Sequence, residues 1–130
     1  MAEHPNVELV RKGYAAFAAG DMATVSELFA DDIVWHWPGN NALSGDHEGK
    51  EAVFRMFAKM AEIAVLRQEV HDVLANDEHA VALVRDHAER TDGRTLDVRE
   101  AHVWHVRDGK AVECWLMGDG DQAAVDAFWS

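Results

Sequence analysis

The chain has 130 residues, with 24 Asp and Glu against 12 Lys and Arg, which gives a formal net charge of −12 at pH 7. Such an acidic surface repels phosphate backbones, which proteins bind through clustered Lys and Arg, so we expect no nucleic-acid partner. No apolar run approaches the roughly 20 residues that a membrane helix needs, so we expect no membrane span.

The length suits a single domain over residues 1–130, with a core that needs no disulfide or structural metal. Cys114 is the only cysteine and cannot form an internal disulfide. The N-terminus lacks the basic start and apolar core of a signal peptide, so we expect a cytoplasmic protein.

Helical spacing of apolar residues comes first along the chain. Val7, Val10, Tyr14 and Phe17 share one helical face and predict a helix over residues 7–19, ended by Gly20. Asp21 can cap a second short helix that ends before residues 31–32. After the first strand, residues 50–64 return to the same spacing and predict a third helix that packs on a sheet.

Strand signals dominate the rest of the chain. Residues 33–37 are β-branched and aromatic and stop at a proline, which predicts a first strand with Ile33, Trp35 and Trp37 on one face. Residues 38–49 read as a loop. Further strands are predicted at 67–74 and 111–117 and as a hairpin over 79–106, followed by a short acidic terminal segment at 119–130. Helices gathered first and antiparallel strands gathered last predict an α+β layer.

The predicted hairpin carries most of the ionisable side chains of interest. A turn at Asp92 and Gly93 gives pairs whose residue numbers sum to 185, or to 187 for a four-residue loop. Both sums give the same shared face, because opposed residues lie on one side of a sheet. That face holds Leu83, Arg85, His87 and Glu89 together with Val98, Glu100, His102 and Trp104. It predicts a polar patch within an apolar pocket.

Five segments resemble one known family: YAAFAAGD, LFADDIVWHWPG, GDHEGKEAV, HVWHVRDGKAVE and DQAAVDAFW. Together they are similar to the nuclear transport factor 2-like superfamily, in its SnoaL-like and ketosteroid-isomerase-related branch. The resemblance covers nearly the whole chain. It implies a cone-shaped, curved mixed β-sheet with three helices packed over it, one apolar cavity and a homodimer. Relatives include isomerases, polyketide cyclases, epoxide hydrolases, dehydratases and non-catalytic binders, so the fold does not name the activity.

The resemblance also tests one specific activity. Ketosteroid isomerases place their general base directly before the first-strand proline, where this chain has Trp37. Their oxyanion-binding tyrosine falls on Gly13, and Tyr14 is one residue away, roughly 100° around a helix. Their second oxyanion donor falls on His102. Steroid isomerisation by that mechanism is therefore not expected.

A second carry-over concerns polyketide cyclases. Their acidic residue near the end of the last strand corresponds to Asp119. Gly118 precedes it, and the alignment at this position stays open by one residue.

Family positions that line the cavity coincide with the residues of the predicted face. We expect His102 to act as the acid-base group, since histidine titrates near neutrality, with Glu100 orienting it and stabilising its protonated form. Arg85 and His87 would polarise an oxygen of the ligand. The cavity would be shaped by Trp35, Trp37, Leu83, Val98, Cys114 and Leu116.

Other interpretations of the same residues stay open. Glu100 and Arg85 could be an ion pair that only closes the cavity. His87, His102 and Glu100 could form a two-histidine, one-carboxylate metal site, although no ligand motif supports it, and we expect neither a metal nor a cofactor.

Three functional classes follow from the sequence. The first is a cofactor-independent enzyme that moves protons on a small hydrophobic molecule, by isomerisation, cyclisation or dehydration. The second is a non-catalytic small-molecule binding or accessory protein, and the third is a dimeric structural module with a filled cavity.

Overall fold

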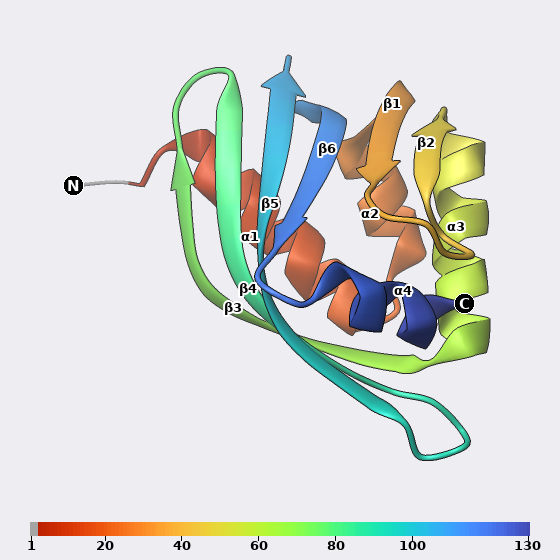
Figure 1. Cartoon of the computed structure of the whole chain (residues 1–130). Helices are drawn as coiled ribbons and strands as arrows, with labels where there is room; N and C mark the ends of the chain where they lie inside the picture. The colour runs from red at the N-terminus through yellow and green to blue at the C-terminus, as the bar shows by residue number, and fades with distance from the viewer. Residues whose placement is uncertain (1–2) are drawn as a thin grey trace.

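The computed structural model describes residues 3–130 and has the expected α+β architecture (Figure 1). Within these residues there are four helices and a six-stranded mixed sheet. No helix in this range is long and apolar enough to cross a membrane. In chain order the elements are α1 Pro5–Ala18, α2 Met22–Leu28, β1 Phe29–Trp37, β2 Gly45–Glu48, α3 Lys50–Ile63, β3 Val65–Ala75, β4 His79–Glu89, β5 Thr95–Arg107, β6 Lys110–Gly118 and α4 Gln122–Trp129.

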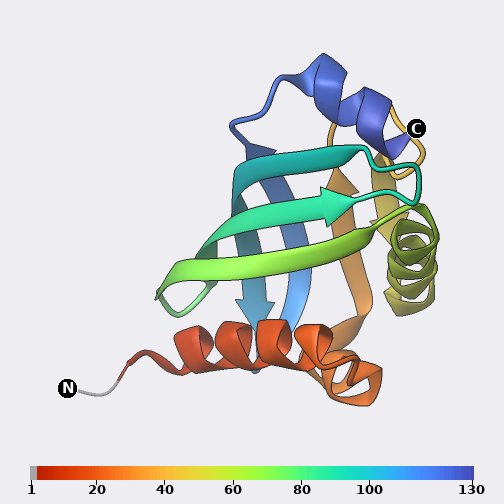
Figure 2. The same cartoon turned by 90° about the horizontal axis from the view of Figure 1, so that it is seen from below.

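The sheet has the strand order β2-β1-β6-β5-β4-β3 and is strongly curved (Figure 1). All neighbouring strands in it are antiparallel except β1 and β6, which are parallel. The inner face carries the core, where the helices α1, α2 and α3 pack. Figure 2 shows α1 along one side of the molecule and α4 at the opposite side. The core residues therefore lie between the curved sheet and these helices.

The first two helices lie close to where the sequence predicts: α1 starts two residues earlier than expected, at Pro5, and α2 ends at Leu28, directly before β1. The His4 imidazole accepts the Asn6 backbone N–H at the start of α1, and Gly20, with a φ of 73°, follows its end. The Asp21 carboxylate accepts the Thr24 N–H and caps α2. Both contacts satisfy N–H groups that a helix start leaves without an intrahelical partner.

Two elements were not expected from the sequence. Strand β2 lies within the predicted loop and pairs with β1, so that Trp35 lies opposite His47. Its four residues have no apolar alternation, which left no strand signal. The terminal segment contains α4, capped by Asp121, so the structure has four helices where the resemblance implied three.

The predicted pairing of the central hairpin is wrong. Strands β4 and β5 pair residues whose numbers sum to 184, with Val84 opposite Glu100 and Asp86 opposite Val98. The loop between Arg90 and Arg94 has three residues, and its last, Gly93, has a φ of 90°. Three-residue loops with a left-handed last residue are a common hairpin type. The odd loop length reverses the face assignment of β4 while that of β5 stands.

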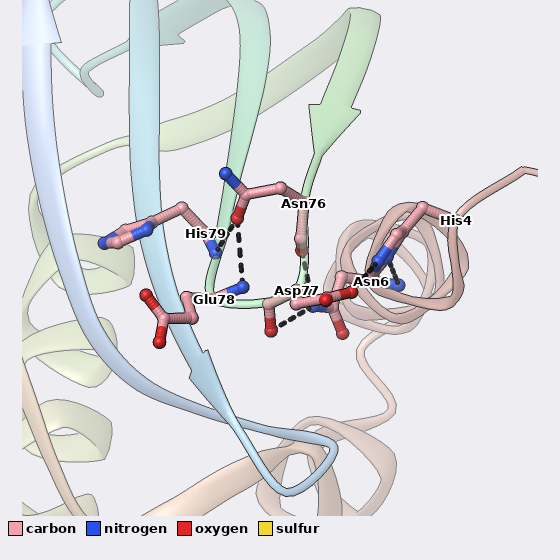
Figure 3. Close-up of polar contacts among 6 residues, drawn as sticks. All are labelled: His4, Asn6, Asn76, Asp77, Glu78 and His79. Carbon is pink, nitrogen blue, oxygen red and sulfur yellow. Dashed lines mark hydrogen bonds and ion pairs between the residues drawn. The ribbon is translucent and has the colours of Figure 1, made fainter.

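A polar contact fixes the start of α1 against the β3–β4 turn (Figure 3). The Asn6 side-chain amide donates to the backbone oxygens of Asn76 and Asp77, at 2.9 and 3.2 Å. Asn6 is only 8% exposed, and the Asn76 side chain in turn accepts the backbone N–H groups of Glu78 and His79. This contact holds the helix that carries Tyr14 at a set position over the sheet.

Substituting Asn6→Ala should lower the free energy of unfolding by about 1–3 kcal/mol, because two hydrogen bonds are lost at a buried site. Urea denaturation measures the change. Asp77→Ala is the matched control: it keeps the backbone oxygen that Asn6 contacts and removes only an exposed carboxylate beside His4. Equal destabilisation by the two variants would contradict this role of Asn6.

Candidate functional site

A cavity of about 80 Å³ lies between the helices and the inner face of the sheet. One water molecule needs about 10–15 Å³ of such space, so the cavity exceeds a single water several-fold. Its walls are mostly aliphatic and aromatic. They comprise Leu9, Val10, Gly13, Tyr14, Phe17, Val25, Leu28, Phe29, Trp35, Trp37, Phe57, Met60, Leu66, Gln68, Asp86, Ala88, Leu96, Val98, Glu100, His102, Trp104, Ala111, Leu116 and Trp129.

The polar side chains of this wall gather in one cluster. Tyr14 reaches it from α1, Gln68 from β3, Asp86 from β4, and Glu100 and His102 from β5. One ligand atom from each of Asp86, Glu100 and His102 lies within 4.8 Å of the others. No Lys or Arg belongs to the wall within residues 3–130, so the two carboxyl groups share the cavity without a cation.

His102 is hydrogen-bonded at both ring nitrogens. Its Nδ1 lies 2.5 Å from the Tyr14 hydroxyl, and its Nε2 lies 2.8 Å from Oε1 of Glu100. The Trp104 indole N–H donates to the same Tyr14 oxygen at 3.3 Å. The imidazole is 3% exposed, so its position and orientation are set by these contacts.

The expected stabilisation of protonated His102 is wrong for this structure. Burial lowers the pKa of His102 to about 4, and the nearby Asp86 only partly offsets it. A charged imidazole loses its hydration in the interior, which favours the neutral ring. At neutral pH His102 is therefore a neutral imidazole that can donate at one nitrogen and accept at the other.

The Asp86 and Glu100 carboxyl groups hold a proton at neutral pH. Burial and the contact with Glu100 raise the pKa of Asp86 to about 8. Burial also raises the pKa of Glu100, although the hydrogen bond with Asp86 works in the other direction. Two carboxylates in one poorly solvated site repel each other, so one of them keeps its proton. The pair thus offers one acid and one base.

Several predicted residues lie where the sequence placed them. Glu100 and His102 meet in the polar cluster. The expectation that Cys114 lines the cavity is wrong, because its side chain is fully buried and is not part of the wall; burial raises the pKa of its thiol. The cavity wall includes Trp35, Trp37, Val98 and Leu116.

Three predicted residues lie on the outer face of the sheet instead. The Arg85 guanidinium donates to Asp97 at 2.9 Å, and His87 lies 3.4 Å from the same carboxylate. Leu83 lies opposite Ala101 on that face. The reversed face of β4 therefore separates Arg85 from Glu100, and it separates His87 from the other two residues of the considered metal site.

Asp119 does not line the cavity. Its carboxylate accepts the backbone N–H and the side chain of Arg99, at 3.0 and 2.9 Å, just beyond the end of β6. These two hydrogen bonds hold the chain just after β6 against Arg99 of β5, which is a structural role.

Sequence reasoning missed two residues of the cluster, Asp86 and Tyr14. Asp86 is the single charged residue in the alternating set Ala80, Ala82, Val84 and Ala88, whereas Arg85, His87 and Glu89 alternate as a solvated face does. This contrast indicates that Asp86 lies on the inner face of the strand. Tyr14 lies one position from the family's tyrosine site, so the resemblance gives it no role, yet its hydroxyl reaches His102.

Solved structures share this fold over nearly their whole length. Bal32a, from a soil-derived mobile gene cassette, is 35% identical with a TM-score of 0.86 and 97% coverage of both chains. A Xanthomonas campestris protein of unknown function with a cystatin-like fold is 29% identical, with a TM-score of 0.85 and coverage of 95% and 97%. A nuclear transport factor 2-like protein of Burkholderia pseudomallei is 23% identical, with a TM-score of 0.85 and 98% coverage. The protein thus has the nuclear transport factor 2-like fold.

The family follows from the sequence comparison. The model of the SnoaL-like domain matches residues 10–114, and the chain belongs to this family. The uncharacterized protein Rv0034 of Mycobacterium tuberculosis is 34% identical over 133 residues, which cover both chains completely. The resemblance inferred from the five sequence segments is confirmed.

Substituting Asp86→Asn should change how stability depends on pH. The folded-state pKa of Asp86 is about 8, whereas an unfolded aspartate titrates near about 3.9. Between these values the folded state holds a proton that the unfolded state has released. The unfolding free energy therefore falls with rising pH, by at most about 1.4 kcal/mol per pH unit, and the variant lacks this contribution.

Chemical denaturation between about pH 5 and pH 9 measures the effect as the difference between variant and wild type. The difference is needed because His102, with its lowered pKa, contributes a slope of opposite sign below about pH 6.5. Asp97→Asn, on the outer face of the same hairpin, is the control. Parallel pH curves for Asp86→Asn and the wild type would contradict the raised pKa.

Proposed function

We propose that this protein binds a small, mainly apolar molecule bearing an oxygen function and moves a proton on it. The reaction type would be an isomerisation, cyclisation or dehydration that uses side chains alone. One observation carries the proposal: the Asp86 and Glu100 carboxyl groups lie together in an apolar cavity, where burial raises the pKa of both. Such a pair supplies a base and an acid at the same pH.

The assignment of roles differs from that expected from the sequence. Asp86 and Glu100 would be the acid-base pair, and neutral His102 would orient Glu100. A general base must lie within hydrogen-bond reach of the proton that it takes, and both carboxyl groups border the cavity. Since Arg85 lies outside, no Lys or Arg among residues 3–130 lines the cavity, so the site favours uncharged ligands such as ketones or lactones.

A second cleft offers a path by which a ligand could reach the cavity. It lies between α1 and β3, with a volume of about 600 Å³, and shares Tyr14, Phe17, Leu66 and Gln68 with the cavity wall. Arg11 and Arg67 stand at its rim. A ligand that enters along this cleft would meet the polar cluster first.

A non-catalytic binding protein is the alternative. It is favoured by Trp37, which occupies the position of the isomerases' base and narrows the cavity with an apolar ring. Solved structures of this fold include proteins assigned as an isomerase and as a polyketide cyclase, but both are 20% identical to this chain and show the fold alone. Turnover therefore has to be separated from binding by experiment.

Exchange of the α-hydrogens of cyclohexanone in D₂O tests the chemistry without knowledge of the natural substrate. We expect the wild type to accelerate deuterium uptake, followed by NMR, because the base removes an α-proton while the acid donates to the carbonyl. Asp86→Asn should lose about 10²–10⁴-fold of this acceleration, the usual share of a general acid or base. Affinity for cyclohexanone, followed through the indole N–H signals, should change little.

Arg85→Gln is the matched control, because it alters the adjacent residue on the outer face and should leave the exchange rate unchanged. Binding of cyclohexanone without accelerated exchange would favour the non-catalytic binder. Neither binding nor exchange, together with no small molecule retained in native mass spectrometry of the purified protein, would favour the structural module.

We also propose that two copies pair through the outer face of the sheet. In register across four strands lie Leu74, Val81, Val103 and Trp115, none of which is buried by the chain itself. Leu83, Ala101 and Met117 form the next row. A contiguous apolar surface of this kind is typical of an interface between protein chains.

Val103→Glu should therefore give a monomer, because it places a charge in the middle of this apolar surface. Sedimentation equilibrium measures the mass of the variant and of the wild type. Glu48→Gln, at the far edge of the sheet, is the control. A monomeric wild type would contradict the dimer and would leave the proposal on the cavity untouched.

A further inference from the structure

The polar cluster connects two separate groups that face the cavity. The Tyr14 hydroxyl lies on the helix side, and the Asp86–Glu100 pair lies on the sheet side. His102 lies between them, with one ring nitrogen on each group, at 2.5 and 2.8 Å. An imidazole can accept a proton at one nitrogen while it releases another from the opposite nitrogen. The chain Tyr14–His102–Glu100 thus has the geometry of a proton relay.

Two arrangements of protons satisfy the same heavy atoms. In the first, Tyr14 donates to Nδ1 of His102, and the Nε2–H donates to an ionised Glu100. In the second, a protonated Glu100 donates to Nε2, the Nδ1–H donates to the Tyr14 oxygen, and the Tyr14 hydroxyl is free to donate into the cavity. Trp104 fits both, because an indole N–H only donates and the Tyr14 oxygen has lone pairs to accept it.

We propose that Tyr14 is a further catalytic residue of this site and that His102 is a relay that passes a proton from Glu100 to it. This inference rests on the proposed function, since it assigns the group that protonates the ligand's oxygen. Asp86 then acts as the base, and its Oδ1, which is buried and has no hydrogen-bond partner among residues 3–130, is available to the ligand.

The proton balance of one step is complete with the ligand alone. The step begins once the shared proton has passed from Asp86 to Glu100, which leaves Asp86 ionised. A ketone then loses an α-proton from carbon to the Asp86 carboxylate, and its carbonyl oxygen takes the Tyr14 hydroxyl proton. Tyr14 is reprotonated from Nδ1 of His102, and Nε2 receives the proton of Glu100. The products are an enol, a protonated Asp86 and an ionised Glu100, which is the first proton arrangement. The reverse shifts return a proton to another carbon of the ligand.

The surroundings of His102 leave few other groups to intervene. Tyr14 faces it from α1, Gln68 and Asp86 lie on the neighbouring strands β3 and β4, and Cys114 lies on β6. Burial raises the pKa values of both Tyr14 and Cys114 well above their ordinary ranges, so neither ionises near neutral pH. Asp119 acts on Glu100 only through its charge.

The relay can be tested in the ligand-free protein by ¹⁵N NMR of His102, which distinguishes the two neutral tautomers. Near pH 8, with Glu100 ionised, we expect the hydrogen on Nε2. As the pH falls and Glu100, whose pKa is raised by burial, becomes protonated, the hydrogen should move to Nδ1 while the ring stays neutral. A His102 that keeps the Nε2 hydrogen until it becomes an imidazolium would overturn the relay.

Two variants test whether the tautomer change of His102 depends on Glu100 and on its neighbour Asp86. In Glu100→Gln the tautomer should no longer change with pH. In Asp86→Leu the change should move to higher pH, because the Asp86 hydrogen bond that lowers the pKa of Glu100 is lost. A tautomer change that survives Glu100→Gln at the same pH would also contradict the relay.

The role of Tyr14 has its own readout. Tyr14→Phe should lower the rate constant of cyclohexanone exchange about 10²–10³-fold, the usual loss on removing one hydrogen-bond donor to a developing oxyanion, with a smaller change in KM. Exchange that is lost in Asp86→Asn and retained in Tyr14→Phe would overturn the role of Tyr14 and leave the proposed function standing. Absence of exchange in the wild type would count against the proposed function itself.

Discussion

The register of the β4–β5 hairpin is the constraint on which the rest of the site depends. Its three-residue loop directs Asp86 into the cavity and Arg85 out of it. A loop shorter or longer by one residue would reverse the two, because side chains alternate along a strand. The cavity would then contain an Arg–Glu ion pair instead of two carboxyl groups that share a proton, and its chemistry would change from proton transfer to anion binding.

Burial then sets the protonation states within the cluster. The same apolar wall that raises the pKa of Asp86 lowers that of His102, so both groups are neutral at neutral pH. A charge in such surroundings is costly unless it is paired. One negative charge, on Glu100, is accepted because His102 and Asp86 donate hydrogen bonds to it. The ordered chain of contacts from Trp104 through Tyr14 to Glu100 follows from the need to give buried polar groups hydrogen-bond partners.

Much of the fold could be predicted from the sequence, because periodicity and capping residues are local signals. The starts of α1 and α2 and the course of β3 to β6 follow from them. The strand β2 and the helix α4 could not be found in that way, since β2 has no apolar alternation and α4 depends on contacts such as that of Asp126 with Asn41. In the site, β5 was assigned to the correct face and β4 to the wrong one. The error came from a loop length that the sequence allows but does not dictate.

The central claim is that one carboxyl group in this cavity is protonated at neutral pH. Titration of the side-chain carboxyl carbons of Asp86 and Glu100 by ¹³C NMR tests it most directly, without a ligand or a substitution. The account predicts that Asp86 titrates at about pH 8, with Glu100 above its ordinary range. Titration of both groups near about pH 4, where exposed carboxyl groups titrate, would contradict it.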